Sequence, residues 1–231
     1  MANKLNEQAR PEEAIEAAIS KSEQFFMDYG KKLLTALCVV VVVVGGFFAY
    51  KYLYKAPQAE KASAMMFVAQ QAFAQDSIAL ALNGDDLNAG FLDVIEEYGS
   101  TDQGNIAHHY AGVCYMKLGE YEKALEQLQA YSNVSGLAAE VVNAQNIGLQ
   151  GDAYVQLKDY QKALKCYEKA VAASENNFTA PYYLFKLAGV YKQLGDNQKA
   201  LEAYKTIRNN YAGSMESQNI DKYIGQLEQL Q

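Results

Sequence analysis

The chain has 231 residues, of which 50% are hydrophobic and 20% are charged, and its formal net charge is −7. The negative excess lies in residues 56–231, and a domain this acidic repels phosphate backbones, which argues against nucleic acid as a partner. With only three prolines and abundant Ala, Leu, Glu, Gln and Lys, the composition favours helices over sheets.

Residues 1–32 are predicted to form a cytoplasmic tail with a short amphipathic helix. Pro11-Glu12-Glu13 has the composition of a helix start, with proline at an early position and acids in the first turn. The helix could run from there through Phe25 and Phe26 into the apolar run that follows. Two interpretations stay open: the helix extends a membrane anchor, or it docks a second protein.

The next segment is the strongest single feature of the sequence. Leu33 to Tyr50 reads LLTALCVVVVVVGGFFAY, without a charge, and as a helix it would measure roughly 27 Å, close to the hydrocarbon thickness of a bilayer. Residues 33–54 are therefore predicted to be a single transmembrane helix. A cleaved signal peptide or a buried core helix fits less well, because a long tail precedes the run and lysines flank both ends.

Both ends of the predicted span carry residues that suit a membrane interface, where lysines extend to water and tyrosines lie among headgroups. The predicted membrane-anchor residues are Lys31, Lys32, Tyr50, Lys51, Tyr52, Tyr54 and Lys55. Lysines within about fifteen residues of each end nearly balance. Only the adjacent Lys31–Lys32 pair favours a cytoplasmic N-terminus.

Residues 55–100 are predicted to hold a long juxtamembrane helix and a degenerate repeat. Pro57 marks a break just outside the membrane, and residues 58–82 have the pattern of one helix that an Asn-Gly-Asp-Asp sequence stops. A shorter helix is expected over about 88–98. Ser100-Thr101-Asp102-Gln103 then resembles a capping box with Ser100 as the cap.

Residues 101–213 contain three self-similar segments: YAGVCYMKLGEYEKALEQL, LQGDAYVQLKDYQKALKCY and KLAGVYKQLGDNQKALEAY. The positions that coincide are Tyr115, Tyr154 and Tyr191; Leu118, Leu157 and Leu194; and Ala124, Ala163 and Ala200. The pattern resembles the tetratricopeptide repeat (TPR), with Gly112 or Gly151 at the small site and Gly119 and Gly195 at the turn. The characteristic Trp is absent, Lys158 replaces the middle turn glycine and Asn197 replaces the last tyrosine.

This resemblance implies an all-α fold, in which a single N-terminal transmembrane helix precedes a TPR-like α-solenoid of antiparallel helix pairs. Residues 214–231 are expected to form a C-terminal capping helix. Its apolar face is Ile220, Tyr223, Ile224 and Leu227, and its other face is polar.

No catalytic constellation stands out in the sequence, and we expect a protein that is not an enzyme and needs no metal, cofactor or small-molecule substrate. His108 and His109 are the only histidines, and neighbours on a helix point about 100° apart, so they do not form one metal face. Cys114 and Cys166 could pair in an extracytoplasmic domain, although two small buried side chains are the simpler interpretation.

In a TPR array the first helix of each pair lines a concave groove, so the resemblance implies a partner-binding face. The expected groove residues are His109, Val113, Met116, Lys117, Asp152, Gln156, Tyr182, Phe185 and Lys192. Positions 149 and 182 are Leu and Tyr, so the chain lacks the Lys/Asn set with which some chaperone-binding TPR domains hold a peptide carboxylate.

The layout of tail, span, long helix and irregular repeats resembles the YfgM-type family of bacterial membrane-anchored TPR proteins. That resemblance implies a single-pass protein of the bacterial inner membrane, with the N-terminus cytoplasmic and the TPR domain periplasmic. It also implies protein partners: the Sec translocon, periplasmic chaperones or secreted clients. Two alternatives remain, namely a scaffold for envelope assembly or cell division and a regulator that acts through its cytoplasmic tail.

Overall fold

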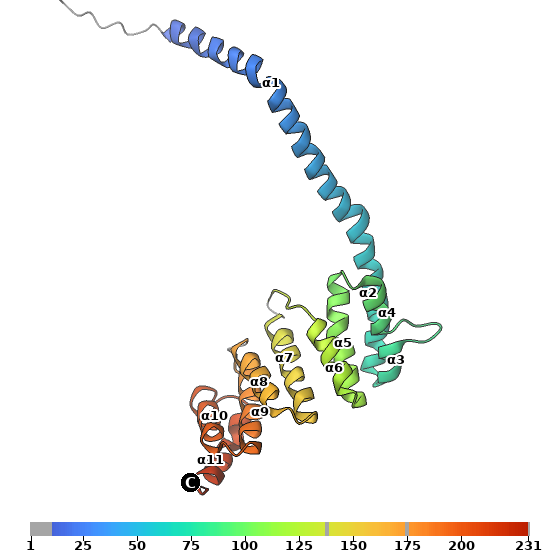
Figure 1. Cartoon of the computed structure of the whole chain (residues 1–231), viewed down its shortest axis with the longest axis vertical. Helices are drawn as coiled ribbons and strands as arrows, with labels where there is room; N and C mark the ends of the chain where they lie inside the picture. The colour runs from blue at the N-terminus through green and yellow to red at the C-terminus, as the bar shows by residue number, and fades with distance from the viewer. Residues whose placement is uncertain (1–10, 137–138, 174–175, 231) are drawn as a thin grey trace, which may run out of the picture. The chain divides into compact units, whose positions relative to one another are not determined.

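The computed structural model describes residues 11–136, 139–173 and 176–230. The chain divides into two compact units with the boundary after Pro57. Throughout the described residues every regular element is a helix (Figure 1), which confirms the predicted all-α fold class.

The first unit is dominated by helix α1, Pro11–Ala49, whose backbone runs without interruption from the predicted tail into the apolar run. The helix therefore continues from the predicted tail into the predicted span, while the side chains of residues 11–22, 24, 26 and 28 lie outside the described set. The apolar side chains from Leu33 to Tyr50 are exposed in the structure. One helical stretch, Tyr29–Ala74, is long and apolar enough to cross a membrane.

The predicted break at Pro57 is wrong, because the backbone stays helical through it. A π-helix, Tyr50–Lys55 (η1), follows α1, and α2, Ala56–Ala74, continues from there. The N–H of Ala56 donates to the carbonyl of Lys51, five residues back, so the turn before the proline is widened. A wide turn accommodates the proline ring and its missing N–H, which would otherwise disrupt the helix.

The single helix predicted over residues 58–82 is also wrong, since α2 ends at Ala74 and α3 runs over Ile78–Asn83. Asp76 adopts a left-handed conformation (φ 57°) between them. A tertiary contact is made at this turn, where the ammonium of Lys117 lies 2.7 Å from the Asp76 carboxylate. Lys117 also lies over the ring of Phe73, 5.3 Å from its centroid.

Helix α4, Phe91–Tyr98, begins three residues later than predicted, after Gly90. The cap of the following helix is Thr101 and not Ser100, because the N–H of Gly104 donates to Thr101 Oγ1 at 3.1 Å. The expected partner in a capping box, Gln103, instead donates from its side chain to Ser63 Oγ at 2.8 Å. The predicted capping box is therefore wrong in its members, although a side-chain cap is present.

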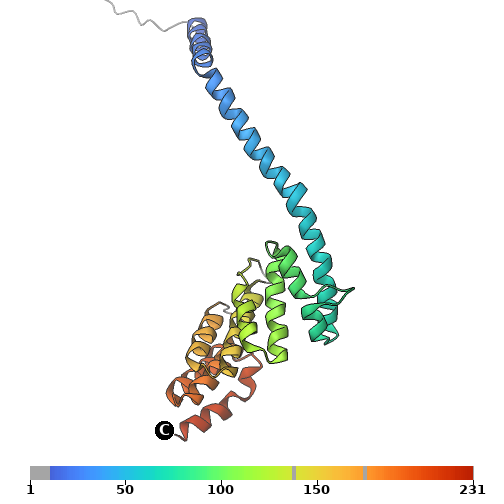
Figure 2. The ribbon, with the colours of Figure 1, turned by 45° about the vertical axis from the view of Figure 1, so that its right-hand side comes forward.

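Three antiparallel helix pairs follow one another side by side in chain order (Figures 1 and 2). The pairs are α5 (Asp102–Leu118) with α6 (Tyr121–Ala130), α7 (Ala139–Gln156) with α8 (Tyr160–Ala172), and α9 (Thr179–Gln193) with α10 (Asn197–Asn210). Glycine at the small site lets the two helices of a pair approach closely. A Cβ at Gly112 would lie 2.5 Å from Leu128, and one at Gly151 would lie 2.6 Å from Tyr167. The aligned alanines are fully buried.

The turns inside the three pairs share one conformation despite their different residues. Gly119 and Gly195 have φ of 78° and 81°, as the repeat pattern predicts, and Lys158 has φ of 60°. The middle copy therefore keeps the left-handed turn without glycine. Asp159 and Asp196 then cap the second helices of their pairs by accepting backbone N–H bonds of 3.2 and 3.1 Å.

The chain ends in a 3₁₀ turn, Glu216–Asn219 (η2), and helix α11, Ile220–Glu228, which packs against α10. Ile220, Ile224 and Leu227 are buried in the same core cluster as α9 and α10, and Tyr223 packs against that cluster. These are the residues of the predicted apolar face.

Candidate protein-binding groove

A groove of about 600 Å³ lies along the first helices of the three pairs. Helices α5, α7 and α9 form its floor. The segment before α9 and the start of η2, with the residue before it, supply the rest of its lining. The lining residues are His109, Val113, Gln145, Leu149, Asp152, Asn177, Phe178, Thr179, Tyr182, Tyr183, Met215 and Glu216. Its size falls in the range of pockets that hold compact ligands, about 300–1,000 Å³.

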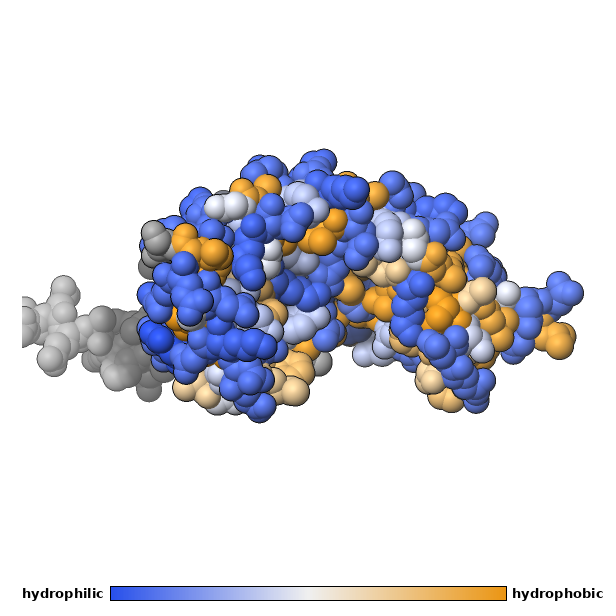
Figure 3. Space-filling view, turned by 90° about the horizontal axis from the view of Figure 1, so that it is seen from below, coloured by the Kyte–Doolittle hydropathy of each residue, from blue (hydrophilic) through white to orange (hydrophobic). Residues whose placement is uncertain are grey.

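Aromatic and aliphatic side chains make up much of the lining. Phe178 and Met215 are 71% and 78% exposed, although both are large apolar residues. Tyr182 is 43% exposed, and its ring meets that of Tyr183 edge-on with centroids 5.1 Å apart. Figure 3 shows that hydrophobic surface gathers in patches on the face in view. Exposed apolar residues that cluster around a concave site are typical of a surface that binds another molecule.

The spacing of α7 and α9 depends on Gly148. A methyl group added at this position would overlap the ring of Tyr183. The absence of a side chain therefore lets the tyrosine lie against the α7 backbone, where it contributes to the groove.

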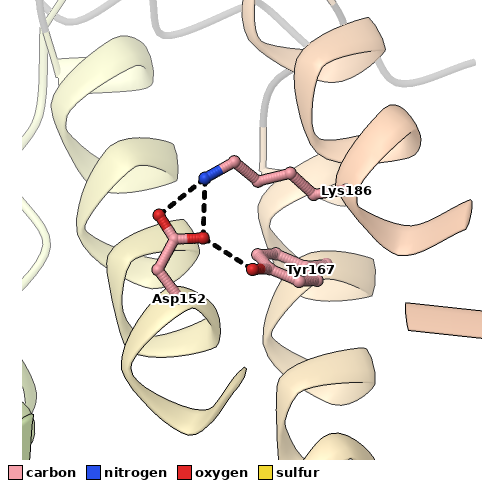
Figure 4. A network of polar contacts seen from close by, with 3 residues as sticks. All are labelled: Asp152, Tyr167 and Lys186. Carbon is pink, nitrogen blue, oxygen red and sulfur yellow. Dashed lines mark hydrogen bonds and ion pairs between the residues drawn. The ribbon is translucent and has the colours of Figure 1, made fainter. Parts of the chain in front are cut away.

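A polar network joins α7, α8 and α9 beside the groove (Figure 4). The ammonium of Lys186 lies 2.7 Å from both carboxylate oxygens of Asp152, and the hydroxyl of Tyr167 donates to Asp152 Oδ1 at 2.6 Å. Lys186 also lies over the ring of Tyr182, 4.7 Å from its centroid. The network ties the second helix pair to the third.

Both proton donors of this network keep their protons. Burial opposes the charge on Lys186, but the Asp152 carboxylate outweighs it and leaves the pKa of Lys186 above its ordinary value. Burial, followed by the nearby carboxylate, raises the pKa of Tyr167. Lys186 therefore carries its positive charge at neutral pH.

His109 is a buried polar residue of the groove floor, as is Thr179 on α9. Its Nδ1 lies 3.3 Å from Nδ2 of Asn146 on α7, and its ring centroid lies 5.9 Å from that of Tyr131. Burial lowers the pKa of His109 from 6.5 to about 4. The imidazole is therefore neutral at physiological pH.

Four of the nine expected groove residues line this groove: His109, Val113, Asp152 and Tyr182. The other five lie elsewhere. Met116 is half-buried, Lys117 turns toward the end of α2, Gln156 and Lys192 are exposed near helix ends, and Phe185 packs against Tyr204 and Tyr223.

Sequence reasoning did not place Leu149, Phe178, Tyr183 or Met215 in the groove. Leu149 had a usable signal, because it lies four residues after Gln145 and three before Asp152 and so shares their helix face. Phe178 and Met215 had no such signal, since both belong to connecting segments outside the repeat pattern.

The cysteines and histidines show no further chemistry in the described part of the chain. Cys38, Cys114 and Cys166 are all free, so Cys114 and Cys166 do not pair. Burial raises the pKa of the Cys114 thiol to about 12, which leaves it unreactive at neutral pH. Within these residues no three His, Cys, Asp or Glu side chains are placed to hold a metal ion.

Comparison with known proteins shows similarity to repeat proteins of several kinds. Superkiller complex protein 3 of Homo sapiens is 27% identical over 139 residues, which is 60% of this chain and 8% of that protein. The 43 kDa receptor-associated protein of the synapse of Gallus gallus is 32% identical over 89 residues, which is 37% of this chain and 22% of that protein. The chain thus spans less than a quarter of the length of these relatives.

Solved structures share the fold at low sequence identity. The crystal structure of MamA protein has a TM-score of 0.52 and 17% identity, covering 74% of this chain and 89% of that one. A Podosopora anserina putative kinesin light chain with TPR-like repeats has a TM-score of 0.54 and 13% identity, covering 74% and 86%. These likenesses show the α-solenoid fold alone.

Two family models match the chain itself. A tetratricopeptide repeat-like domain matches residues 23–138, and a tetratricopeptide repeat matches residues 140–212. TPR domains are protein–protein interaction modules, and proteins built from them are typically scaffolds without enzymatic activity. Since the first match alone covers half of the chain, the protein belongs to the tetratricopeptide repeat-like domain family.

Proposed function

We propose that this chain is a membrane-tethered protein-binding module whose groove holds an apolar segment of another polypeptide. The observation that carries the proposal is the groove itself, with Phe178 and Met215 largely exposed at its edge. Aromatic residues and Met supply much of the binding energy at protein interfaces, and Met adapts its shape to different partners.

The setting of the groove supports a specific role. An apolar helix of membrane-spanning length precedes the repeats, and a tether raises the local concentration of a weak binder beside its clients. The resemblance to the YfgM-type layout supports a periplasmic groove that receives secreted proteins beside the Sec translocon, or passes them to periplasmic chaperones.

In-cell photo-crosslinking tests the proposal. A photo-reactive amino acid at Tyr182 samples the groove, and one at Leu194 is the matched control, because Leu194 is 40% exposed and lies at the end of the same helix, outside the groove. Captured proteins are identified by mass spectrometry. Phe178→Ser should reduce capture at Tyr182 severalfold without unfolding the protein, since the removed side chain is mostly exposed.

Translocon subunits, periplasmic chaperones or many secreted chains captured at Tyr182 but not at Leu194 would support the proposal. A single envelope-assembly or division protein would support the scaffold alternative instead. Cytoplasmic proteins alone would contradict the proposed orientation, and equal capture at both positions would contradict the groove as the binding site.

A further inference from the structure

A chain of hydrogen bonds runs from the core of the first repeat pair to the groove. The side-chain Nε2 of Gln150 lies 3.3 Å from the backbone carbonyl oxygen of Leu128 and 2.9 Å from Oδ1 of Asn146. Nδ2 of Asn146 in turn lies 3.3 Å from Nδ1 of His109. These hydrogen bonds connect α6, α7 and α5, and the side chain of Asn146 between them is almost completely buried.

The carbonyl oxygen of Leu128 fixes which group donates and which accepts in each of these hydrogen bonds. A backbone carbonyl oxygen only accepts hydrogen bonds, so the atom of Gln150 that faces Leu128 must be the NH₂ group. The same group donates to Asn146, which must present its carbonyl oxygen there and its NH₂ group to His109. Nδ1 of His109 therefore accepts a hydrogen bond and carries no proton.

The tautomer of His109 follows from this direction. In a neutral imidazole one ring nitrogen accepts and the other donates, so Nε2 carries the proton. No hydrogen bond joins Nε2 to another group in the described part of the chain, and His109 belongs to the groove lining. Nε2–H is thus the hydrogen-bond donor of the His109 ring that remains available to a ligand.

The charges of the lining restrict what this donor can bind. The ionisable side chains that line the groove, apart from His109 and the tyrosines, are the carboxyl groups of Asp152 and Glu216, and no Lys or Arg lines it. Because the ammonium of Lys186 compensates the charge of Asp152, the like charge that a ligand carboxylate would meet is mainly that of Glu216. That charge, beside a donor without positive charge, disfavours binding of a carboxylate. A neutral carbonyl has neither disadvantage.

We infer that His109 is a fixed hydrogen-bond donor that takes a main-chain carbonyl from the interior of an apolar polypeptide segment, and that the groove rejects a terminal carboxylate. This inference rests on the proposed function, because it names the ligand chemistry of the same groove. A net contribution typical of one neutral hydrogen bond corresponds to a 3- to 10-fold change in affinity.

The tautomer is tested without any ligand. ¹⁵N-imidazole NMR of the full-length protein in phospholipid nanodiscs, without a histidine tag, reports two histidines, and His108→Gln leaves His109 alone. We expect the Nε2–H form at pH 7. An Nδ1–H form would overturn the inference. Asn146→Asp should move the proton toward Nδ1, because a carboxylate at that position accepts where the amide donated.

The ligand preference is tested with two probe peptides, acetyl-Leu-Phe-Leu-amide and the same peptide with a free carboxylate. Titration is followed in every variant by the backbone amide resonances of the groove helices, and also by the His109 Nε2–H shift where His109 is present. The amide should bind at least threefold more tightly than the acid, and His109→Phe should weaken amide binding 3- to 10-fold. Tighter binding of the acid, or amide binding that His109→Phe leaves unchanged, would overturn the inference and leave the proposed function standing.

Failure of the proposed function gives a different result. If neither peptide binds and the groove resonances do not shift, the groove is not a polypeptide-binding site. Both the proposed function and the inferred carbonyl contact are then refuted. The Nε2–H tautomer would still be observed in that case. The two failures are therefore distinguishable.

Discussion

Loss of the Asp152 carboxylate should destabilise the second and third helix pairs, because Lys186 would keep its charge without a partner. In Asp152→Asn the side chain keeps its size and still accepts a hydrogen bond from Tyr167. What disappears is the negative charge that lies 2.7 Å from the ammonium of Lys186. The perturbation thus removes mainly one ion pair.

The expected magnitude follows from burial. Removing one member of a fully buried pair costs roughly 3–5 kcal/mol, and an exposed pair contributes about 0–1 kcal/mol. The side chains of Asp152 and Lys186 are 23% and 25% exposed, so this pair lies between the two limits. We expect Asp152→Asn to lower the free energy of unfolding by about 2 kcal/mol.

The assay is urea unfolding of the full-length chain in nanodiscs, followed by circular dichroism. Glu228→Gln is the matched control, because it removes the partner of Lys205 in a more exposed ion pair of 2.9 Å. It should cost less than about 0.5 kcal/mol.

A double-mutant cycle with Lys186→Met isolates the pair itself. The double variant should be more stable than the sum of the single effects predicts, by about 1 kcal/mol or more, since neither charge is then left alone. Additive effects, or a cost for Asp152→Asn no larger than the control, would refute the reasoning.

Three further predictions concern single positions, each measured by urea unfolding. Because the folded pKa of His109 is lowered from 6.5 to about 4, the unfolding free energy should fall as pH drops from 6.5 to 4, by up to about 3 kcal/mol, in the wild type and in His108→Gln but not in His109→Phe. Gly148→Ala should destabilise by about 1–2 kcal/mol and Gly189→Ala, with open space around it, should stabilise by up to about 1 kcal/mol. Lys158→Gly should stabilise by about 0.5–1 kcal/mol, because it removes left-handed strain.

The three repeats and the turns within them could be predicted from sequence because their signals are local. The aligned tyrosines, leucines and alanines recur at helical spacing, and each repeat packs mainly on its neighbours. Gly119 and Gly195 mark turns that depend on their own backbone conformation. The departure at Lys158 shows the limit of that signal, since the same turn forms without glycine.

The breaks outside the repeats depend on contacts that the local pattern does not contain. Asp76, at the turn between α2 and α3, contacts Lys117, forty-one positions later, and no residue near Asp76 in the sequence indicates that partner. The opposite error occurred at Pro57, where a proline that normally ends a helix is accommodated by a π-helical turn. Both errors concern where a helix is interrupted: residues 75–77 interrupt the helix predicted over 58–82, and the backbone around Pro57 is helical.

The groove could be predicted in part for the same reason. His109, Val113, Asp152 and Tyr182 follow from the rule that first helices line the concave face. Whether a residue of those helices reaches the groove depends on neighbouring side chains, as Phe185 illustrates by packing against α10 and α11. Phe178 and Met215 lie in connecting segments, and the repeat period does not specify which connecting segments pass beside the groove.

The chemistry of the groove bears on why the chain would need a membrane tether. Apolar walls and one neutral donor give similar affinities to many apolar segments, because main-chain carbonyls occur in every polypeptide. Selectivity must then come from where the groove is held, and a tether supplies an effective concentration of up to about millimolar for clients nearby. Under the proposed function, residues 58–231 separated from residues 1–57 should therefore bind the probe peptides as tightly as the full chain, yet capture far fewer clients in cells. Equal capture by the released domain would show that affinity alone selects its partners.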